Sequence, residues 1–229
     1  MKTLIIIPVY NEEQNIEKVI SRLKENAPYV DYIVVNDCSG DNTVSVCRKN
    51  GFHYISLPVN LGIGGGVQAG YRYALEHDYD IAVQMDGDGQ HDAKYIDKIL
   101  EPILKDEADI VIGSRFLLKQ GFQSSRLRRM GIGFLSYLIK ACSGTEVKDV
   151  TSGFRAVNKK FIRIYSQDYS QDYPEPEAII AGAFHMGRIK EVPVIMHERE
   201  SGSSSIHSWK IVYYMIKVSL AIFTYRLKF

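Results

Sequence analysis

Short apolar runs alternate with helical patterns along the first half of the chain. Each run has the length of a buried strand, and the segments between them repeat apolar residues at helical spacing or carry helix-capping signals. The expected strands are 4–9, 32–35, 54–57, 81–85 and 110–112, and the expected helices are 12–25, a segment following 41–43, 66–77 and 93–105. This alternation predicts an α/β fold with a mainly parallel sheet covered by helices on both faces.

The second half of the chain is less regular. It contains neither an internal repeat nor a linker that would split it. We expect an Arg- and Ser-rich loop over 120–129, a helix over 132–141, a polar turn over 149–155, a strand over 192–196, a flexible Gly/Ser segment over 199–205 and a long apolar helix over 209–227. We therefore divide the chain into an α/β domain, 1–206, and a C-terminal amphipathic helix, 207–229.

Polar residues gather where the expected strands end. Because ligands of parallel sheets bind at the carboxyl ends of strands, these clusters predict one shared binding site. The clusters are Pro8–Glu13, Asn36–Asp41, Asp86–His91 and Ser114-Arg115.

The segment Asp86-Gly87-Asp88 carries the clearest candidate chemistry. Its two carboxylates can converge on one hard cation, which would in turn hold a diphosphate. A plain Asp-Gly turn is the alternative. A calcium loop is excluded because His91 stands where that loop requires Gly. A dinucleotide fingerprint is disfavoured, since the turn after the first strand has no glycine and the glycines at 62–66 follow the third. Those glycines suit a loop near a bound nucleotide, or a helix start.

Charge and composition narrow the class of protein. The 229 residues have an ordinary soluble composition and a net charge of +1, so nucleic acid is not an expected partner. The three cysteines, Cys38, Cys47 and Cys142, form no CxxC motif, which fits a reducing cytosol. The apolar run at the N-terminus is too short for a signal peptide. Residues 207–229 carry four basic residues and no acid, which hints at an anionic surface.

Taken in order, these motifs resemble family 2 glycosyltransferases of the GT-A fold. The matching segments are 7–12, 35–41, 86–90 and 113–115, and Asp149–Arg155 matches the DxxSGFR pattern of the dolichyl- and polyprenyl-phosphate sugar synthases. The resemblance covers about residues 4–206. It implies an inverting transferase that moves one sugar from a nucleotide diphosphate donor and depends on Mg²⁺ or Mn²⁺.

The resemblance also assigns roles to residues. It implies that the donor is bound by Pro8, Tyr10, Glu12, Asp37, Ser39, Asp86 and Gln90, with Asp37 accepting from a uracil-type N–H. Asp86 and Asp88 would hold the metal, with Asp88 the principal ligand, and Arg115 would face the phosphates. Tyr10 and Glu12 also suit a plain helix N-terminus.

A basic segment and an acidic segment are candidates for binding or activating the acceptor. Arg126, Arg128 and Arg129 are interpreted as a clamp for an acceptor phosphate or as a solvated loop. Arg199 stands where the resembled synthases place a phosphate-binding Arg beside a Gly/Ser loop, although Ser205-Ile206 replaces their usual Lys-Leu. Glu175 and Glu177, with Asp172 nearby, are candidate bases for a hydroxyl acceptor, or else an exposed Pro-spaced turn. A lipid phosphate is already an anion and needs no base. No QxxRW motif occurs, which disfavours a processive synthase.

The C-terminal segment indicates where in the cell the protein works. Its uninterrupted apolar run, 218–225, is far shorter than the roughly 20 residues that span a bilayer. An interfacial helix at the cytoplasmic face of the membrane fits better, although it could pack on the protein's own core or on a partner. The resembled synthases with two appended transmembrane helices are longer, so we expect peripheral binding or a small membrane partner subunit.

We expect the acceptor to be polyprenyl phosphate and the donor UDP-N-acetylglucosamine or UDP-glucose. One alternative is transfer to a hydroxyl of a lipid-linked glycan during cell-surface polysaccharide synthesis. Another is an inactive nucleotide-sugar-binding subunit, against which the intact Asp86 and Asp88 pair speaks.

Overall fold

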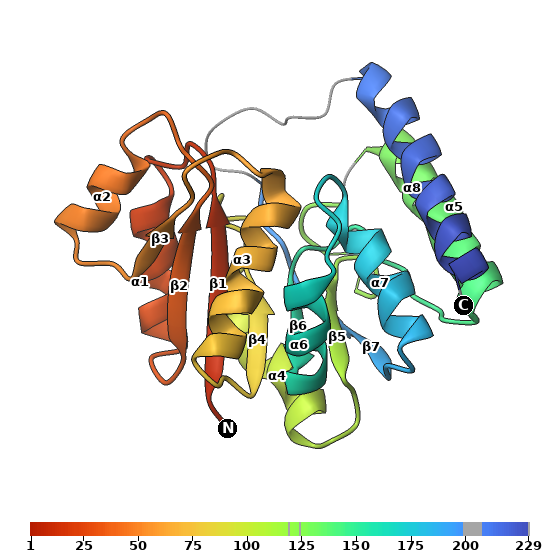
Figure 1. The fold of residues 1–229 in the computed structure, drawn as a ribbon, viewed down its shortest axis with the longest axis horizontal. Coiled ribbons are helices and arrows are strands. Elements are labelled where there is room, and N and C mark those ends of the chain that lie inside the picture. Colours follow the sequence, from red (N-terminus) through yellow and green to blue (C-terminus); the bar gives the residue numbers. More distant parts are fainter. Residues whose placement is uncertain (119, 124, 199–207, 229) are drawn as a thin grey trace.

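A computed structural model describes residues 1–118, 120–123, 125–198 and 208–228 of the protein. A seven-stranded sheet runs through the centre of these parts of the chain (Figure 1). Its strands are β1 (Thr3–Val9), β2 (Asp31–Asn36), β3 (Tyr54–Ser56), β4 (Ile81–Gln84), β5 (Ile110–Ser114), β6 (Arg155–Asn158) and β7 (Ile189–Pro193), in the order β3-β2-β1-β4-β6-β5-β7. Only β6 runs antiparallel to its neighbours, so the predicted mainly parallel α/β sheet is confirmed.

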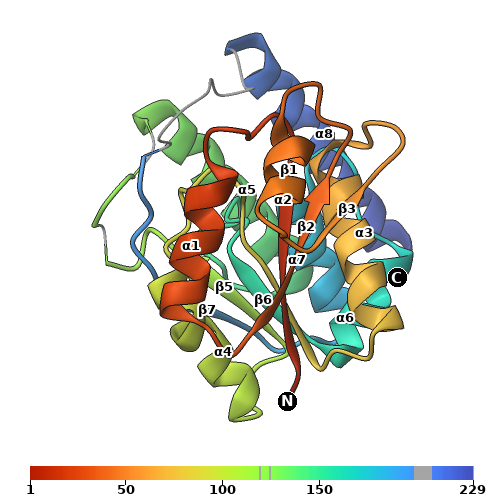
Figure 2. The ribbon, with the colours of Figure 1, turned by 90° about the vertical axis from the view of Figure 1, so that its left-hand side faces the viewer.

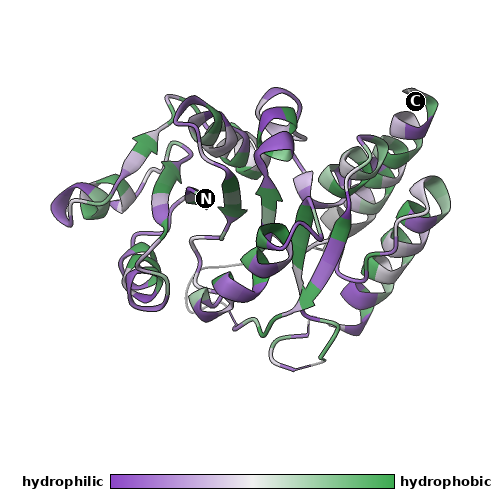
Figure 3. Ribbon diagram, turned by 90° about the horizontal axis from the view of Figure 1, so that it is seen from below, coloured by the Kyte–Doolittle hydropathy of each residue, from purple (hydrophilic) through white to green (hydrophobic). Residues whose placement is uncertain are grey.

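Helices cover both faces of this sheet, as the alternation predicts (Figure 2). One face carries α1 (Ile16–Asn26), α2 (Thr43–Lys49), the short 3₁₀ turn η1 (Ala93–Tyr95) and α4 (Ile96–Leu104), and the other carries α3 (Gly62–Glu76), α6 (Lys159–Gln167) and α7 (Pro174–Phe184). A hydrophobic core lies on each face. In β1, Leu4 and Ile6 pack into the core under α3, α6 and α7, whereas Ile5 and Ile7 pack into the core under α1 and α4, and all four are fully buried. Hydrophobic residues accordingly dominate the central strands (Figure 3).

Two further helices, α5 (Arg126–Ser143) and α8 (Ser208–Lys228), lie side by side at one end of the molecule (Figure 1). Ile132 and Leu135 of α5 and Val218 and Ile222 of α8 join the same core as α7. The expected C-terminal helix is therefore present, and it packs on the protein through one of its faces.

Several boundaries differ from the expectations. The expected loop over 120–129 is wrong from Arg126 onward, because Ser125 accepts a hydrogen bond from the Arg128 amide and caps α5 there. The helix expected from residue 12 begins only at Ile16, after hydrogen-bonded turns on the Glu12 carbonyl. The glycines at 62–66 open α3. The strand expected at 192–196 is β7, shifted toward the N-terminus.

Three elements were not predicted: β6, α6 and α7. Strand β6 is only four residues long, and its first residue is a buried arginine, so it lacks an apolar run. In the sequence, the alternation of proline and glutamate from Pro174 is interpreted as a turn. Proline is also favoured in the first turn of a helix, and α7 begins with Pro174. The expected Gly/Ser segment 199–205 lies outside the described residues.

Candidate active site

A first cavity of about 440 Å³ lies at the carboxyl ends of β1, β2 and β4, beside the start of α3. It is lined by Pro8, Val9, Tyr10, Glu12, Asp37, Asn60, Gly62, Ile63, Gly66, Asp86, Gly87 and Asp88. The sequence predicted a shared site at this edge, and three of its polar clusters meet here.

Asp37 is held firmly at the inner wall of the first cavity. Its side chain is buried, and its Oδ1 accepts a hydrogen bond from the Leu61 amide at 2.7 Å. The Asp37 amide donates to the Val9 carbonyl at 2.9 Å, and the Asn60 Nδ2 donates to the Asp37 carbonyl at 3.0 Å. These bonds join the ends of β1 and β2 to the segment that opens α3.

Glu12 is fixed in the same way. Its amide donates to the Thr43 hydroxyl at 2.9 Å, and its Oε2 accepts from Asn15 Nδ2 at 2.6 Å. Tyr10 is half exposed in the lining of the cavity. Ser39, a predicted donor contact, does not line the cavity; its hydroxyl accepts from the Asn11 amide at 2.9 Å and braces the neighbouring loop.

The loop after β4 presents the two predicted metal ligands. Asp86 lies in the walls of both the first cavity and a second one described below, and Asp88 lines the first. Asp88 Oδ1 accepts from the Gln90 amide at 3.0 Å, which closes the turn. The Asp86 amide donates to Nδ1 of buried His91, whose ring stacks on Phe154 with centroids 4.9 Å apart.

This pair of carboxylates fits a hard divalent cation that takes its remaining ligands from a diphosphate. Mg²⁺ bound with substrate phosphates typically uses one or two protein carboxylates. Within the described residues no group of three or more His, Cys, Asp or Glu side chains could hold a metal ion.

Gly153 explains how the segment after Asp149 reaches this loop. A Cβ built at Gly153 would lie 3.0 Å from Asp86 Oδ2 and 3.0 Å from Gln84 Nε2, closer than side chains ordinarily pack. Because β6 is antiparallel, its beginning lies at the edge where β4 and β5 end. The turn before β6 therefore contacts Asp86. A side chain larger than that of glycine at position 153 would force the Asp86 carboxylate to move.

A second cavity of about 580 Å³ adjoins the first and shares Ile63 and Asp86 with it. Its walls come from segments that are distant in sequence: the β4 loop, the turn before β6, the start of α7, and the inner sides of α5 and α8. Polar lining includes Gln90, His91, Arg115, Arg128, Thr151, Asp172 and Glu175, and apolar lining includes Phe122, Ile132, Met196, Tyr214 and Met215.

Arg115 reaches the second cavity but is already paired. Its Nε and Nη2 donate to the Asp149 carboxylate at 2.7 and 2.6 Å, and Asp149 is fully buried. Nη2 also donates to the Thr151 hydroxyl at 3.0 Å. The structure therefore makes Arg115 a fixed part of the wall rather than a free cation. Asp149 was not predicted as a site residue, although it opens the DxxSGFR motif.

The predicted arginine clamp is divided by the start of α5. Arg128 lines the second cavity, and desolvation together with the Arg115 charge lowers the pKa of its guanidinium. All three arginines are exposed to solvent, but Arg126 and Arg129 do not line that cavity, and Arg129 lies over the Phe116 ring. Arg199 lies outside the described residues. Of the basic residues in this segment, Arg128 is thus the one that the structure brings to the site.

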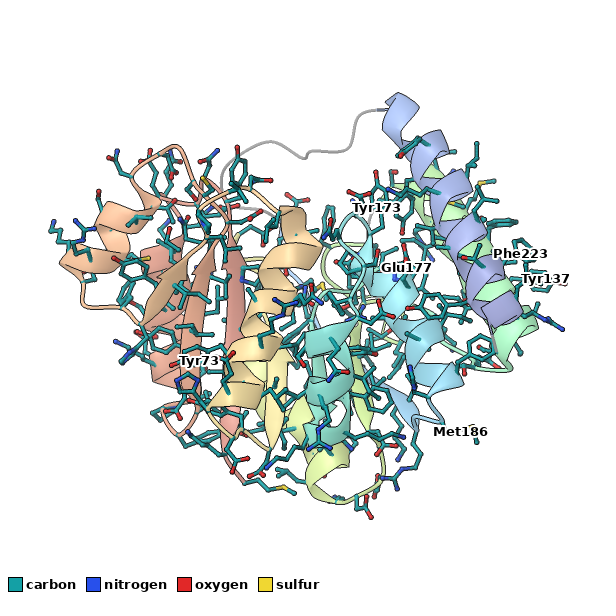
Figure 4. The ribbon with its side chains drawn as sticks, viewed as in Figure 1. Tyr73, Tyr137, Tyr173, Glu177, Met186 and Phe223 are labelled. Carbon is teal, nitrogen blue, oxygen red and sulfur yellow. The ribbon has the colours of Figure 1, made fainter. Side chains whose placement is uncertain are left out.

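The candidate acids are separated as well. Glu175 lines the second cavity, and burial raises the pKa of its carboxyl although the Arg155 charge opposes the shift. Asp172 also lines it, and pairs with Lys217 of α8. Glu177 instead faces a pocket with Asp168, Ser170, Thr224 and Tyr225, between α7 and α8. Figure 4 shows Glu177 one turn along α7 from Tyr173, a residue in the cavity wall.

Arg155 is a buried residue that the sequence did not single out. Its Nη2 donates to the Ser152 carbonyl at 2.6 Å, and its Nη1 donates to the Glu175 carbonyl at 3.1 Å. The side chain is fully buried beside the hydroxyl-bearing rings of Tyr71, Tyr165 and Tyr169. Arg155 therefore ties the turn beside Asp86 to the first turn of α7, and so fixes two walls of the second cavity.

Comparison with known proteins identifies the family of the chain. A model of the family described as "Glycosyl transferase family 2" matches residues 4–165. An undecaprenyl-phosphate mannosyltransferase of Micrococcus luteus is 32% identical over 215 residues, which cover 90% of this chain and 88% of that protein. A UDP-N-acetylglucosamine–dolichyl-phosphate N-acetylglucosaminyltransferase of Methanococcus voltae is 30% identical over 243 residues, covering 94% and 95%.

A solved structure shares the architecture. It is the glucosyl-3-phosphoglycerate synthase from Mycobacterium tuberculosis in complex with Mn²⁺, UDP-glucose and phosphoglyceric acid. It superposes with a TM-score of 0.77 over 98% of this chain and 79% of that one, at 19% identity, which establishes the GT-A fold. The extent of the family match shows that the chain belongs to glycosyl transferase family 2.

Proposed function

We propose that this family 2 glycosyltransferase transfers one sugar, with inversion, from a nucleotide diphosphate sugar to polyprenyl phosphate. The observation that carries the proposal is the shared wall at Asp86, which brings a nucleotide-sized cavity and a partly apolar, cation-lined cavity together. A sugar held at that wall is open to attack from the second cavity, so direct displacement requires no movement of the donor.

The first cavity would bind the donor. Asp37, Glu12 and Tyr10 would contact the nucleoside, and the solved relative binds UDP-glucose with Mn²⁺. Asp86 and Asp88 would hold a divalent cation, Mg²⁺ or Mn²⁺, which when bound neutralises charge on the departing diphosphate. UDP-N-acetylglucosamine or UDP-glucose is the proposed donor, supported by the names of these two relatives.

The second cavity would bind the acceptor phosphate, with Arg128 as its direct cationic contact. A phosphate monoester is an anionic nucleophile, so this transfer needs no base. The relatives of Micrococcus luteus and Methanococcus voltae are named for undecaprenyl- and dolichyl-phosphate acceptors. We place the reaction at the cytoplasmic face of a membrane, where the three free cysteines suit a reducing compartment.

Transfer to a hydroxyl of a lipid-linked glycan is the second candidate, and Glu175 is the observation that favours it. This carboxyl lies in the second cavity, and burial shifts its pKa upward, which is the direction that makes a carboxylate a stronger base. The two candidates differ in what the nucleophile requires of the protein.

A donor and acceptor panel tests the proposal. We expect release of UDP from UDP-sugars only with a divalent cation, and acceleration by polyprenyl phosphate but not by the dephosphorylated polyprenol. Acceleration by a lipid-linked glycan alone would replace the first candidate with the second. Absence of both donor binding and turnover under Mg²⁺ and Mn²⁺ would leave the inactive-subunit reading.

A further inference from the structure

Gln84 is a polar side chain at the end of an otherwise apolar strand, β4. It is fully buried, and β4 lies between β1 and β6 inside the sheet. An amide that is buried without hydrogen-bond partners destabilises a fold, so buried amides are normally bonded. The contacts of Gln84 therefore indicate why this position is polar.

Both ends of the Gln84 amide are bonded. Its Nε2 donates to Asp86 Oδ1 at 3.3 Å, and its Oε1 accepts from the Tyr169 hydroxyl at 3.4 Å. The reverse orientation would turn the amide oxygen toward a carboxylate, which can only accept. Burial raises the pKa of Tyr169 well above its ordinary value, so the hydroxyl keeps the proton that it donates. The orientation of the amide is thus set from both sides.

The Asp86 carboxylate is bounded by protein on its inner side. His91 Nε2 lies 3.7 Å from its Oδ2. Because His91 Nδ1 accepts from the Asp86 amide, the neutral ring carries its proton on Nε2, toward that oxygen. Gly153 makes room for the contact with Gln84, since a Cβ there would lie 3.0 Å from both Asp86 Oδ2 and Gln84 Nε2. The Asp86 side chain keeps 31% of its surface exposed, in the wall of the two cavities.

Tyr169 is itself held in place. Its ring packs against those of Tyr71 and Tyr165, with centroids 5.4 and 5.3 Å away. The loop that follows it is fastened to the start of α3, where the Gly64 amide donates to the Gln171 carbonyl at 3.0 Å. A Cβ at Gly64 would lie 1.9 Å from a carbonyl oxygen of that loop, so the close approach requires glycine. The hydroxyl that bonds Gln84 therefore comes from a fixed ring.

We propose that Gln84 is a positioning residue, which holds the Asp86 carboxylate in the orientation that binds the divalent cation, and that Tyr169 orients Gln84. The inference rests on the proposed function, in which Asp86 holds the cation of the donor complex. Loss of a group that hydrogen-bonds a metal-binding side chain typically weakens metal affinity roughly 10- to 100-fold. Neither Gln84 nor Tyr169 lines either cavity, so each acts on the cation through Asp86.

Calorimetric titration of the full chain with Mn²⁺, in the presence of UDP, tests the inference. Gln84→Met keeps the length of the side chain without its amide, and we expect the affinity for Mn²⁺ to fall on the order of 10-fold. Tyr169→Phe leaves the bond to Asp86 but frees the amide to turn, so a loss of about threefold is expected. At saturating Mn²⁺, turnover of both variants should return close to that of the wild type, because the effect lies in cation binding.

Tyr165→Phe is the matched control. Its hydroxyl belongs to the same group of buried rings but donates to the Ala178 carbonyl at 2.7 Å. This variant should lose thermal stability while its Mn²⁺ affinity stays at the wild-type value. The double variant Gln84→Met with Tyr169→Phe should bind Mn²⁺ as Gln84→Met does, since Tyr169 acts through Gln84.

Unchanged Mn²⁺ affinity in Gln84→Met would overturn the proposal, and additive losses in the double variant would overturn the part assigned to Tyr169. If Gln84→Met does not fold, Tyr169→Phe is compared with Tyr165→Phe, and equal Mn²⁺ affinities of these two variants contradict the proposal. Asp86→Asn separates the two levels. Wild-type Mn²⁺ affinity in Asp86→Asn would refute the proposed metal site itself, whereas a loss there without a loss in Gln84→Met would refute only the positioning role.

Discussion

The two cavities of this enzyme are built by different means. The first is made by consecutive strand ends, and its polar side chains are held by short hydrogen bonds to neighbouring loops, such as Asp37 to Leu61 and Glu12 to Thr43. The second is made by segments that are distant in sequence and are held by a few buried charges, above all Arg115 with Asp149 and the guanidinium of Arg155. The first cavity thus depends on the ends of the strands, and the second depends on tertiary packing.

Removal of a carboxylate from the first cavity is expected to have the largest effect. Asp88→Asn keeps an oxygen that can accept from the Gln90 amide, so the loop should persist while the charge is lost. We expect turnover to fall on the order of 10³-fold, because the leaving diphosphate loses its electrostatic stabilisation. Metal-dependent UDP binding, measured by calorimetry, should weaken in parallel. Asp92→Asn, on the same loop but in neither cavity, serves as control and should stay near wild type.

Loss of the ion pair in the wall of the second cavity should chiefly affect stability. Asp149→Ala leaves Arg115 buried without its carboxylate, which costs roughly 3–5 kcal/mol in the free energy of unfolding. Urea denaturation measures this loss. Glu101→Ala breaks the exposed pair with Lys105 at the end of α4 and should leave the free energy of unfolding nearly unchanged. Similar losses in both variants would remove the contrast between the two sides of the site.

Two arginines of α5 allow a comparison between a residue that lines the second cavity and one that does not. Arg128→Ala should raise the KM for polyprenyl phosphate roughly 10- to 100-fold, as expected for a lost charge-assisted hydrogen bond, and leave donor hydrolysis unchanged. Arg126→Ala, two residues earlier on the same helix and outside the cavity, should change the KM measured with detergent-dispersed acceptor only slightly. If both variants behave alike, the acceptor phosphate does not bind where Arg128 points.

Glu175 is expected to give the smallest effect. With polyprenyl phosphate as acceptor, Glu175→Gln should change turnover less than about threefold, since no proton must be removed. A hydroxyl acceptor would instead require a loss on the order of 10²-fold, and the wild-type rate would fall as the pH drops through the raised pKa of Glu175. The pH–rate profiles of the two proteins separate these outcomes.

Glu175→Gln should also change how the free energy of unfolding depends on pH. A raised pKa means that the folded state holds its proton more tightly than the unfolded chain. Stability should therefore decrease as the pH rises from the ordinary carboxyl range to the raised pKa of Glu175. Glu175→Gln should abolish that decrease, and unchanged pH dependence would contradict the burial of the charge.

The sequence predicted the first cavity well for a physical reason. Strand ends in a parallel sheet converge whatever the details of packing, so Pro8, Asp37 and Asp86 could be placed together from the alternation alone. Ser39 follows the same strand but does not line the cavity, and its hydroxyl accepts a hydrogen bond from the Asn11 amide within the loop.

The second cavity could not be assembled in this way. The roles of Asp149 and Arg155 appear only once β6 is known to run antiparallel between β4 and β5. Glu175 and Glu177 are two residues apart, and only the helical first turn of α7 shows that they face different pockets. Contacts set by tertiary packing leave no periodic signal along the chain.

The wall that Ile63 and Asp86 give to both cavities has a kinetic consequence. Under the proposed assignment of the cavities, the two substrates are bound at the same time and the sugar passes directly from donor to acceptor, without a covalent intermediate on a side chain. The rate law of such an enzyme contains a ternary complex, so double-reciprocal plots at several acceptor concentrations intersect instead of running parallel. The shared wall thereby implies that both substrates are bound before the sugar is transferred.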